Sequence, residues 1–254
     1  MNSVQIKAYL ERIDAVFEKP DYENLCRLQR CHLFSVPYEN LDILKNIKID
    51  LNTDALFDKI VTRRRGGYCF EVNRLFGELL RALGYNVTDL AARYLRGDSG
   101  IPMRRHHVLK VGCADGEYLC DVGVGEPLPM EPVPYLTAEP FTDSFQGTYF
   151  FKEDEMLGNV LCEYHNGRVR DVISFTEELW VQADYETISF WCEKSPLSIF
   201  NKDIILAIRQ RPRTRVTLSG KIMHRFTDGT VEERVLSDEE LAHELKYTFG
   251  IADY

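Results

Sequence analysis

At residues 63–71 the chain reads Arg-Arg-Arg-Gly-Gly-Tyr-Cys-Phe-Glu. The two glycines allow a tight turn of the backbone directly before a helical pattern that runs from Phe70 to Leu83. Cys69 is therefore predicted in the first helical turn, where unpaired N–H groups and the helix dipole favour an anion. Because a thiolate is such an anion, this position would lower the pKa of the thiol and make Cys69 a candidate nucleophile. A small buried cysteine that only packs would have the same local sequence.

A second group of candidate catalytic side chains lies on a predicted β-hairpin. His106 and His107 begin its first strand, and Asp121 lies on the returning strand. If Asp115-Gly116 forms a two-residue turn, Asp121 lies opposite Lys110, and the even-numbered residues of the first strand share its face. A base and the carboxylate that orients it must lie this close together, so the pattern favours His106. A three-residue turn would select His107 instead.

The helical and β-type patterns divide the chain into three segments. Residues 1–84 have apolar positions at helical spacing and are expected to form a helical bundle that carries Cys69. Residues 85–194 contain short β-type runs separated by turn dipeptides such as Asn166-Gly167, which predicts an antiparallel barrel or sandwich that carries the histidine and the aspartate. Residues 195–254 are expected to form a linker followed by strands and a helix.

Several individual elements are also predicted. The first helix is expected to extend from Gln5 to Phe17. The last segment is expected to begin with a short helix within residues 195–209, followed by strands over residues 216–226 and 231–236. A final helix is predicted to begin at Ser237, which forms a capping box with Glu240.

Composition and charge restrict the classes of function. Apolar residues make up 44% of the 254 positions, and the formal net charge of −9 has the wrong sign for a surface that neutralises nucleic-acid phosphates. The sequence lacks an apolar run long enough to cross a membrane, and acidic residues interrupt its start, where a signal peptide needs an apolar stretch. Seven cysteines without a Cys-x-x-Cys pair argue for thiols rather than disulfides, a cytoplasmic location and no metal site. We therefore expect no nucleic acid and no membrane as partners.

Cysteine, histidine and aspartate in this chain order are the set that acyl transfer needs. Residues 65–73, RGGYCFEVN, resemble the nucleophile motif of the arylamine N-acetyltransferases, and residues 36–41, VPYENL, resemble that family's VPFENL. Residues 106–125, which end in DVGVG, residues 195–200, SPLSIF, and residues 249–251, FGI, are similar to further segments of the family. The resemblance therefore spans nearly the whole chain.

The resemblance implies an α+β fold with an N-terminal helical bundle, a central antiparallel β-barrel and a C-terminal α/β lid, around a catalytic core like that of cysteine proteases. It implies that Cys69 accepts the acyl group, that His106 is its general base and that Asp121 orients the histidine. Arg65 is expected to form a structural ion pair. Acetyl-CoA would be the acetyl donor, as a substrate and not as a tightly bound cofactor. An arylamine, hydrazine or N-hydroxyarylamine would then take the acetyl group from the Cys69 thioester in a ping-pong reaction.

The resemblance also implies a substrate pocket lined by Tyr38, Phe70 and Val124. Val124 stands where the family usually has phenylalanine in DVGFG, and Tyr38 stands where it usually has phenylalanine in VPFENL. Because Val124 is smaller, the family's usual preference among aromatic amines is not expected to carry over. For the phosphates of CoA, the candidates are the N-terminus of a helix or an alternating basic run that would also suit a solvated strand edge: Arg209, Arg211, Arg213 and Arg215.

Two other classes of function remain open from the sequence. A cysteine hydrolase related to transglutaminases or proteases uses cysteine, histidine and aspartate in the same order. A related amide synthase, or a binding protein with a vestigial site, would share the family pattern. The match along the whole chain, with Cys69, His106 and Asp121 intact, favours the acetyltransferase and leaves the preferred acceptor and the oligomeric state open.

Overall fold

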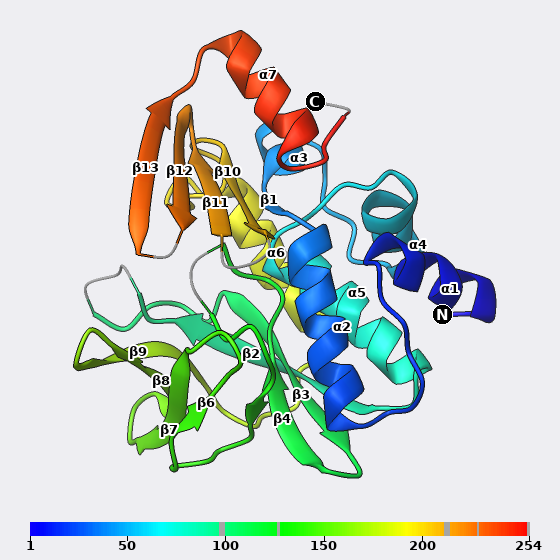
Figure 1. Ribbon diagram of the computed structural model, residues 1–254, viewed down its shortest axis with the longest axis vertical. Coiled ribbons are helices and arrows are strands. Elements are labelled where there is room, and N and C mark those ends of the chain that lie inside the picture. The colour runs from blue at the N-terminus through cyan, green and yellow to red at the C-terminus, as the bar shows by residue number, and fades with distance from the viewer. Residues whose placement is uncertain (97–99, 126–127, 211–213, 228, 253–254) are drawn as a thin grey trace.

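The N-terminal helices form one side of the molecule, and two β-sheets lie beside them (Figure 1). The computed structural model describes residues 1–96, 100–125, 128–210, 214–227 and 229–252. Its helices are α1 (Ser3–Arg12), α2 (Tyr22–Ser35), α3 (Leu41–Leu44), α4 (Thr53–Phe57), the π-helical turn η1 (Asp58–Thr62), α5 (Cys69–Ala82), α6 (Gln182–Lys194) and α7 (Asp238–Tyr247). In Figure 1, α1, α2, α4 and α5 lie together beside the two sheets.

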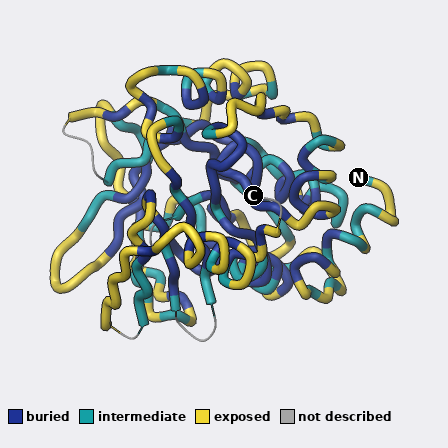
Figure 2. The backbone as a smooth tube through the Cα atoms, turned by 90° about the horizontal axis from the view of Figure 1, so that it is seen from above, coloured by how far each residue is buried: buried dark blue, intermediate teal, exposed yellow. Residues whose placement is uncertain are grey.

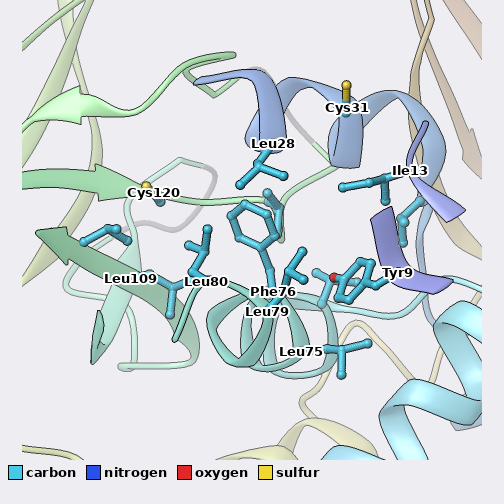
Figure 3. Packing of buried hydrophobic residues seen from close by; sticks show 14 of the residues in the cluster. Tyr9, Ile13, Leu28, Cys31, Leu75, Phe76, Leu79, Leu80, Leu109 and Cys120 are labelled. Carbon is cyan, nitrogen blue, oxygen red and sulfur yellow. The ribbon is translucent and has the colours of Figure 1, made fainter. Parts of the chain in front are cut away.

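The N-terminal helices pack around α5. Phe76 and Leu79 of α5 are fully buried and belong to one apolar cluster with Tyr9 of α1 and Leu28 of α2 (Figure 3). Leu109 of the barrel extends this cluster on the other side of the helix. Burying each side chain of this size contributes about 1.5–3 kcal/mol, so α5 is firmly held at the junction between helices and barrel.

Local signals explain where two of the helices begin or end. α1 ends at Arg12 and does not extend to the predicted Phe17, because Asp14 adopts a left-handed conformation with a φ of 53°. α7 begins as predicted. The hydroxyl of Ser237 accepts the N–H of Glu240 at 3.2 Å, and the Glu240 carboxylate accepts the N–H of Ser237 at 2.8 Å.

An antiparallel sheet of eight strands forms a nearly closed barrel. In pairing order its strands are β5 (Val133–Pro134), β4 (Gly116–Cys120), β3 (His106–Cys113), β2 (Asn86–Tyr94), β9 (Arg168–Phe175), β8 (Gly158–His165), β7 (Thr148–Asp154) and β6 (Phe141–Thr142). The turn between β8 and β9 is the predicted Asn166-Gly167, with φ values of 50° and 74°. Two positive φ values match the right-handed twist of the paired strands.

The hairpin of β3 and β4 turns one residue earlier than predicted. Its two-residue loop is Ala114-Asp115 and not Asp115-Gly116. Lys110 therefore pairs with Leu119, two positions before Asp121. Because side chains alternate with a period of two, this shift leaves the even-numbered residues of β3 on the face that the prediction gave them.

The lid is a five-stranded antiparallel sheet. Its strands pair in the order β1 (Tyr38–Glu39), β10 (Ile205–Gln210), β11 (Thr214–Ser219), β12 (Ile222–Thr227) and β13 (Thr230–Val235). One face packs against α7 through an apolar cluster that includes Leu206, Leu218 and Leu245. β1 comes from the N-terminal part of the chain and pairs with β10 through Tyr38 and Ala207. The lid therefore contains a strand from the same part of the chain as α5.

Three further elements differ from the prediction. The short helix expected within residues 195–209 does not occur in that described range, because the end of it forms β10 and pairs with β1. The strand expected over residues 216–226 is divided into β11 and β12 by a turn at Gly220, which has a φ of 57°. Helix α6 is not predicted because its apolar pattern is weak: Ser189 is buried, whereas Phe190 is 63% exposed.

Buried residues lie mainly at the centre of the molecule, and exposed residues lie mainly at its rim (Figure 2). Within the described residues, every helix is too short or too polar to pass through a lipid bilayer.

Candidate active site

Cys69 is the first residue of α5, and the glycines before it let the chain approach β1 closely. A Cβ atom at Gly66 would lie 1.9 Å from the carbonyl oxygen of Pro37, and one at Gly67 would lie 2.8 Å from Cβ of Glu71. A larger residue at Gly66 would push the chain away from Pro37, which directly precedes β1, and one at Gly67 would collide with the side chain of Glu71. The Glu71 carboxylate caps the start of α5 by accepting, at 3.1 Å, the N–H of the residue before Cys69. Together these contacts fix the position of the sulfur-bearing residue.

His106 and Asp121 form a buried hydrogen-bonded pair next to Cys69. Nε2 of His106 lies 2.6 Å from Oδ2 of Asp121. Sγ of Cys69 lies 3.8 Å from the carbonyl oxygen of Arg105, the residue before His106, and Cys69 and His106 line the same cavity. The exposed fractions of Cys69, His106 and Asp121 are 2%, 4% and 6%. The structure thus brings together the three side chains that the sequence singled out.

The expectation that the helix N-terminus lowers the pKa of Cys69 is wrong. Burial raises the pKa of the Cys69 thiol well above its ordinary value, and the neighbouring Cys192 acts in the same direction. Backbone N–H groups of His107 and Phe70 lower the pKa but do not outweigh burial. Ionisation of the sulfur therefore depends on a base that accepts its proton, and the imidazole of His106 lines the same cavity.

His107 belongs to a different pair and lies outside the cavity that Cys69 lines. Its Nε2 lies 2.9 Å from Oδ1 of Asp89, and its ring centroid lies 4.4 Å from that of Tyr185. The side chain is 1% exposed, and burial lowers its pKa. The prediction that His106, rather than His107, faces Asp121 is therefore confirmed.

Asn73 is a residue of the site that the sequence analysis missed. It follows Cys69 by four residues on α5, and its Nδ2 donates to Oδ1 of Asp121 at 2.8 Å. The spacing from Cys69 is the sequence signal that could have indicated Asn73, because residues four apart in a helix lie on the same face.

A buried cluster of ion pairs joins the start of α5 to β1, α3 and η1. Arg65 donates to Glu39 at 2.7 Å and to Asp42 at 3.0 Å, as expected for a structural ion pair. Lys59 pairs with Asp42 at 2.8 Å and with Glu71 at 2.7 Å. Burial raises the pKa of Glu71 to about 7, although Lys59 opposes this shift. The cluster holds the turn before α5 in place.

The site opens into a cavity of about 900 Å³ between barrel and lid. From the barrel side the cavity is lined by Tyr94, His106 and the loop at Gly123, and from the lid side by Thr217 and Phe226. A space of this size accommodates a ligand of several hundred daltons. Among the residues that the structure describes, no three potential metal ligands gather at one point.

Comparison with known proteins identifies the family. The N-acetyltransferase family matches residues 21–252 of this chain. The arylamine N-acetyltransferase of Mycolicibacterium smegmatis is 32% identical over 264 residues, which cover 98% of this chain and 92% of the relative. This chain belongs to the arylamine N-acetyltransferase family.

Solved structures of arylamine N-acetyltransferases share the fold. The enzyme from Salmonella typhimurium superimposes with a TM-score of 0.93 at 28% identity and covers 100% of this chain and 93% of that one. The Mycobacterium marinum enzyme in complex with CoA has a TM-score of 0.90 at 31% identity and covers 97% of this chain and 93% of that one. The α+β architecture of helical bundle, antiparallel barrel and α/β lid is thereby confirmed.

Two of the three residues expected in the acceptor pocket of this arylamine N-acetyltransferase line its cavity. Tyr38 and Val124 are both part of the cavity wall. Phe70 is not, because its side chain points into a buried aromatic cluster, with its ring centroid 5.3 Å from that of Tyr68 and 6.1 Å from that of Tyr185. Phe70 therefore supports the start of α5 and does not contact the open space.

The basic run considered for the CoA phosphates lies on β10 and β11. Arg209 and Arg215 are paired across the two strands, whereas Arg211 and Arg213 lie outside the described residues. Arg215 lines the cavity, donates to the carbonyl oxygen of Gly125 at 3.2 Å and packs on the ring of Phe226 at 3.9 Å. In this arylamine N-acetyltransferase, Arg215 thus joins the lid to the barrel loop that follows Asp121.

Proposed function

We propose that Cys69, His106 and Asp121 carry out the transfer of an acetyl group from acetyl-CoA to the nitrogen of an arylamine, in two steps through a thioester on Cys69. The observation that supports the proposal is the 2.6 Å contact between His106 and Asp121 on the wall of the cavity that Cys69 lines. Membership of the arylamine N-acetyltransferase family and the complex of the Mycobacterium marinum relative with CoA support the choice of substrates.

In the first step, the imidazole of His106 accepts the proton of the Cys69 thiol. Nε2 of His106 bonds to Asp121, so Nδ1 is the nitrogen that exchanges this proton. The thiolate attacks the carbonyl carbon of the acetyl thioester, a new carbon–sulfur bond forms, and the bond to the sulfur of CoA breaks. The departing CoA thiolate takes the proton back from His106. One thioester replaces another, so the step is close to balanced in energy.

In the second step, the amine attacks the acetyl group on Cys69. His106 accepts the proton that the nitrogen loses, the carbon–sulfur bond breaks, and the proton returns to the sulfur. Asp121 acts in both steps by orienting the ring and stabilising the imidazolium that forms. Hydrazines attack through a nitrogen, as arylamines do, and N-hydroxyarylamines attack through nitrogen or the hydroxyl oxygen. Both classes are further acceptors in this proposal.

Burial of the three side chains explains why the site needs this arrangement. A thiol whose pKa is raised by burial is a poor nucleophile on its own. Transfer of its proton to an adjacent imidazole creates two opposite charges at short range, where a low dielectric strengthens their attraction. The cost of ionising Cys69 is thus offset only when His106 and Asp121 are both in place.

Mass spectrometry of the intact protein tests the proposal. Incubation with acetyl-CoA alone should add one acetyl group, and peptide mapping should place it on Cys69. Subsequent addition of an arylamine should remove it with formation of the acetylated amine. Cys69→Ser and His106→Gln serve as the negative variants, with His107→Gln as the matched control. If the protein acquires the acetyl group only when the amine is present, the two-step route is refuted.

The location and the internal division of the chain are further proposals. We infer that the protein works in the cytoplasm, which is supported by the presence of all seven cysteines as thiols. The division into residues 1–84, 85–194 and 195–254 stays a prediction, and the pairing of β1 with β10 shows that the first and last of these segments share one sheet.

A further inference from the structure

Asp121 is contacted by a side chain to which the proposed mechanism gives no role. We propose that Asn73 is a positioning residue, whose amide holds the Asp121 carboxylate so that one of its oxygens faces His106. The inference rests on the proposed function of Cys69, His106 and Asp121.

Asn73 uses both ends of its side-chain amide at the site. Nδ2 donates to Oδ1 of Asp121 at 2.8 Å and to the carbonyl oxygen of His107 at 2.6 Å, and Oδ1 accepts the N–H of Val122 at 2.9 Å. The last two contacts hold the chain directly after His106 and directly after Asp121. Since Asn73 is 0% exposed, water does not take over these contacts.

The two oxygens of Asp121 have different partners. Oδ1 accepts from Asn73 and from the N–H of Gly123, each at 2.8 Å, whereas Oδ2 lies 2.6 Å from Nε2 of His106. Two donors on one oxygen restrict rotation of the carboxylate, so the other oxygen stays directed at the imidazole. Space is tight here as well. A Cβ atom at Gly123 would lie 2.6 Å from Nδ2 of Asn73 and 2.7 Å from Cα of Cys69.

One helix therefore carries both the sulfur and the group that positions the carboxylate. Cys69 and Asn73 are four residues apart on α5 and lie on the same face. Movement of α5 would carry the sulfur and the amide together, and through Asp121 it would carry His106. This coupling keeps the imidazole aligned with the thiol when the proton is transferred between them.

The variant Asn73→Ala tests the inference through the rate of the first step. In stopped-flow or quenched reactions with acetyl-CoA alone, acetylation of Cys69 should slow by about 10- to 100-fold, which is the loss expected for hydrogen bonds to a charged group. The KM for acetyl-CoA should change by less than about 3-fold, because Asn73 is buried and does not line the cavity. A variant that loosened the whole site would change both quantities.

A second readout is the reaction of Cys69 with iodoacetamide as a function of pH. A poorly oriented carboxylate stabilises the imidazolium less, so the midpoint of alkylation should move to higher pH by about one unit in Asn73→Ala. Several titratable and charged groups surround this position: Tyr38 of β1, Tyr68, Cys69 of α5, Tyr94 of β2, Arg105, His106 and His107 of β3, Asp121, and Cys192 of α6. All of them are present in both proteins, so the difference reports the loss of the amide.

A double-mutant cycle separates positioning from a general structural role. In an Asp121→Asn background, Asn73→Ala should slow acetylation by less than about 3-fold, because its effect is exerted through the carboxylate that has been removed. Asn24→Ala is the matched control. Asn24 is a buried amide, 2% exposed, that bonds to Asp21 at the start of α2, and its loss should leave acetylation unchanged.

The outcomes are distinct from those for the proposed function. If the wild-type protein fails to acquire an acetyl group on Cys69, the proposed function fails before any Asn73 variant is measured. If the wild type is acetylated and Asn73→Ala is equally fast, or loses as much rate in the Asp121→Asn background as alone, the positioning role is overturned. Should Asn73→Ala not fold by circular dichroism, Asn73→Ser, whose shorter side chain does not span to Asp121, replaces it with the same expected results.

Discussion

Glu71→Gln should remove a pH dependence from the stability of the folded protein. Burial raises the pKa of Glu71 from 4.5 to about 7. The folded protein therefore binds this proton below about pH 7, whereas the unfolded chain binds it only below about pH 4.5. The stability that neutral Glu71 contributes is complete below the lower value and is lost as the pH rises through the upper one. At 1.36 kcal/mol per unit, the shift corresponds to about 3 kcal/mol.

Urea unfolding followed by tryptophan fluorescence, at intervals from pH 4.5 to pH 8, measures this effect. The unfolding free energy of the wild type should fall relative to Glu71→Gln by about 3 kcal/mol across that range. The sign follows from the raised pKa, because the wild type gains from the proton at low pH and the variant does not. Glu23→Gln is the control for the loss of a carboxylate, since Glu23 is an exposed partner of Arg27 and lies outside the buried cluster. A difference between the wild type and Glu71→Gln that stays constant with pH would refute the raised pKa of Glu71.

Three further predictions concern activity. His106→Ala should lower kcat by about 10³-fold or more, whereas His107→Ala, whose side chain lies outside the cavity, should lower it by less than about 10-fold. Steady-state kinetics with one arylamine checks this ranking, and a reversed order would assign the role of base to His107. Gly123→Ala should slow acetylation of Cys69 by about 10²-fold, because the new Cβ would lie 2.7 Å from Cα of Cys69. Stopped-flow acetylation measures this rate, and an unchanged rate would show that the loop at Gly123 moves without disturbing Cys69. Val124→Phe should raise the KM for bulky arylamines by about 10-fold without changing the rate of acetylation of Cys69, because the larger side chain narrows the cavity wall. A panel of amines of increasing size checks this, and a KM that falls for the larger amines would contradict it.

Most of the site could be predicted because its signals are local. The helical pattern after Gly66-Gly67 is enough to place Cys69 at a helix start, and strand alternation is enough to put His106 on the face of Asp121. Because side chains alternate with a period of two, a register shift of two residues leaves the same residues on each face of the strand. For this reason the sequence selects His106 as the histidine that contacts Asp121, even though the loop is Ala114-Asp115.

The elements that could not be predicted depend on contacts between distant parts of the chain. One edge of β10 pairs with the neighbouring β11, whereas its other edge pairs with β1, more than 160 residues earlier, and no local pattern in residues 205–210 contains that second pairing. Asn73 is polar and falls within an apolar helix, yet its partners lie on β3 and in the segment that follows β4, so only the spacing from Cys69 hints at its role. The raised pKa of Cys69 could not be predicted for the same reason, because the burial that raises it is supplied by the barrel and α6.

The short strand β1 has a consequence for engineering this enzyme. Tyr38 faces the cavity, Glu39 belongs to the ion cluster, and Asn40 bonds to the main chain at Phe200 and Ile205. In a chimaera that takes only its C-terminal segment from a relative, the relative's lid sheet would have to pair with β1 of this chain and not with its own first strand. Grafting should therefore transfer residues 38–40 together with the donor's lid, and a fragment truncated before β10 should expose an unpaired edge prone to aggregation.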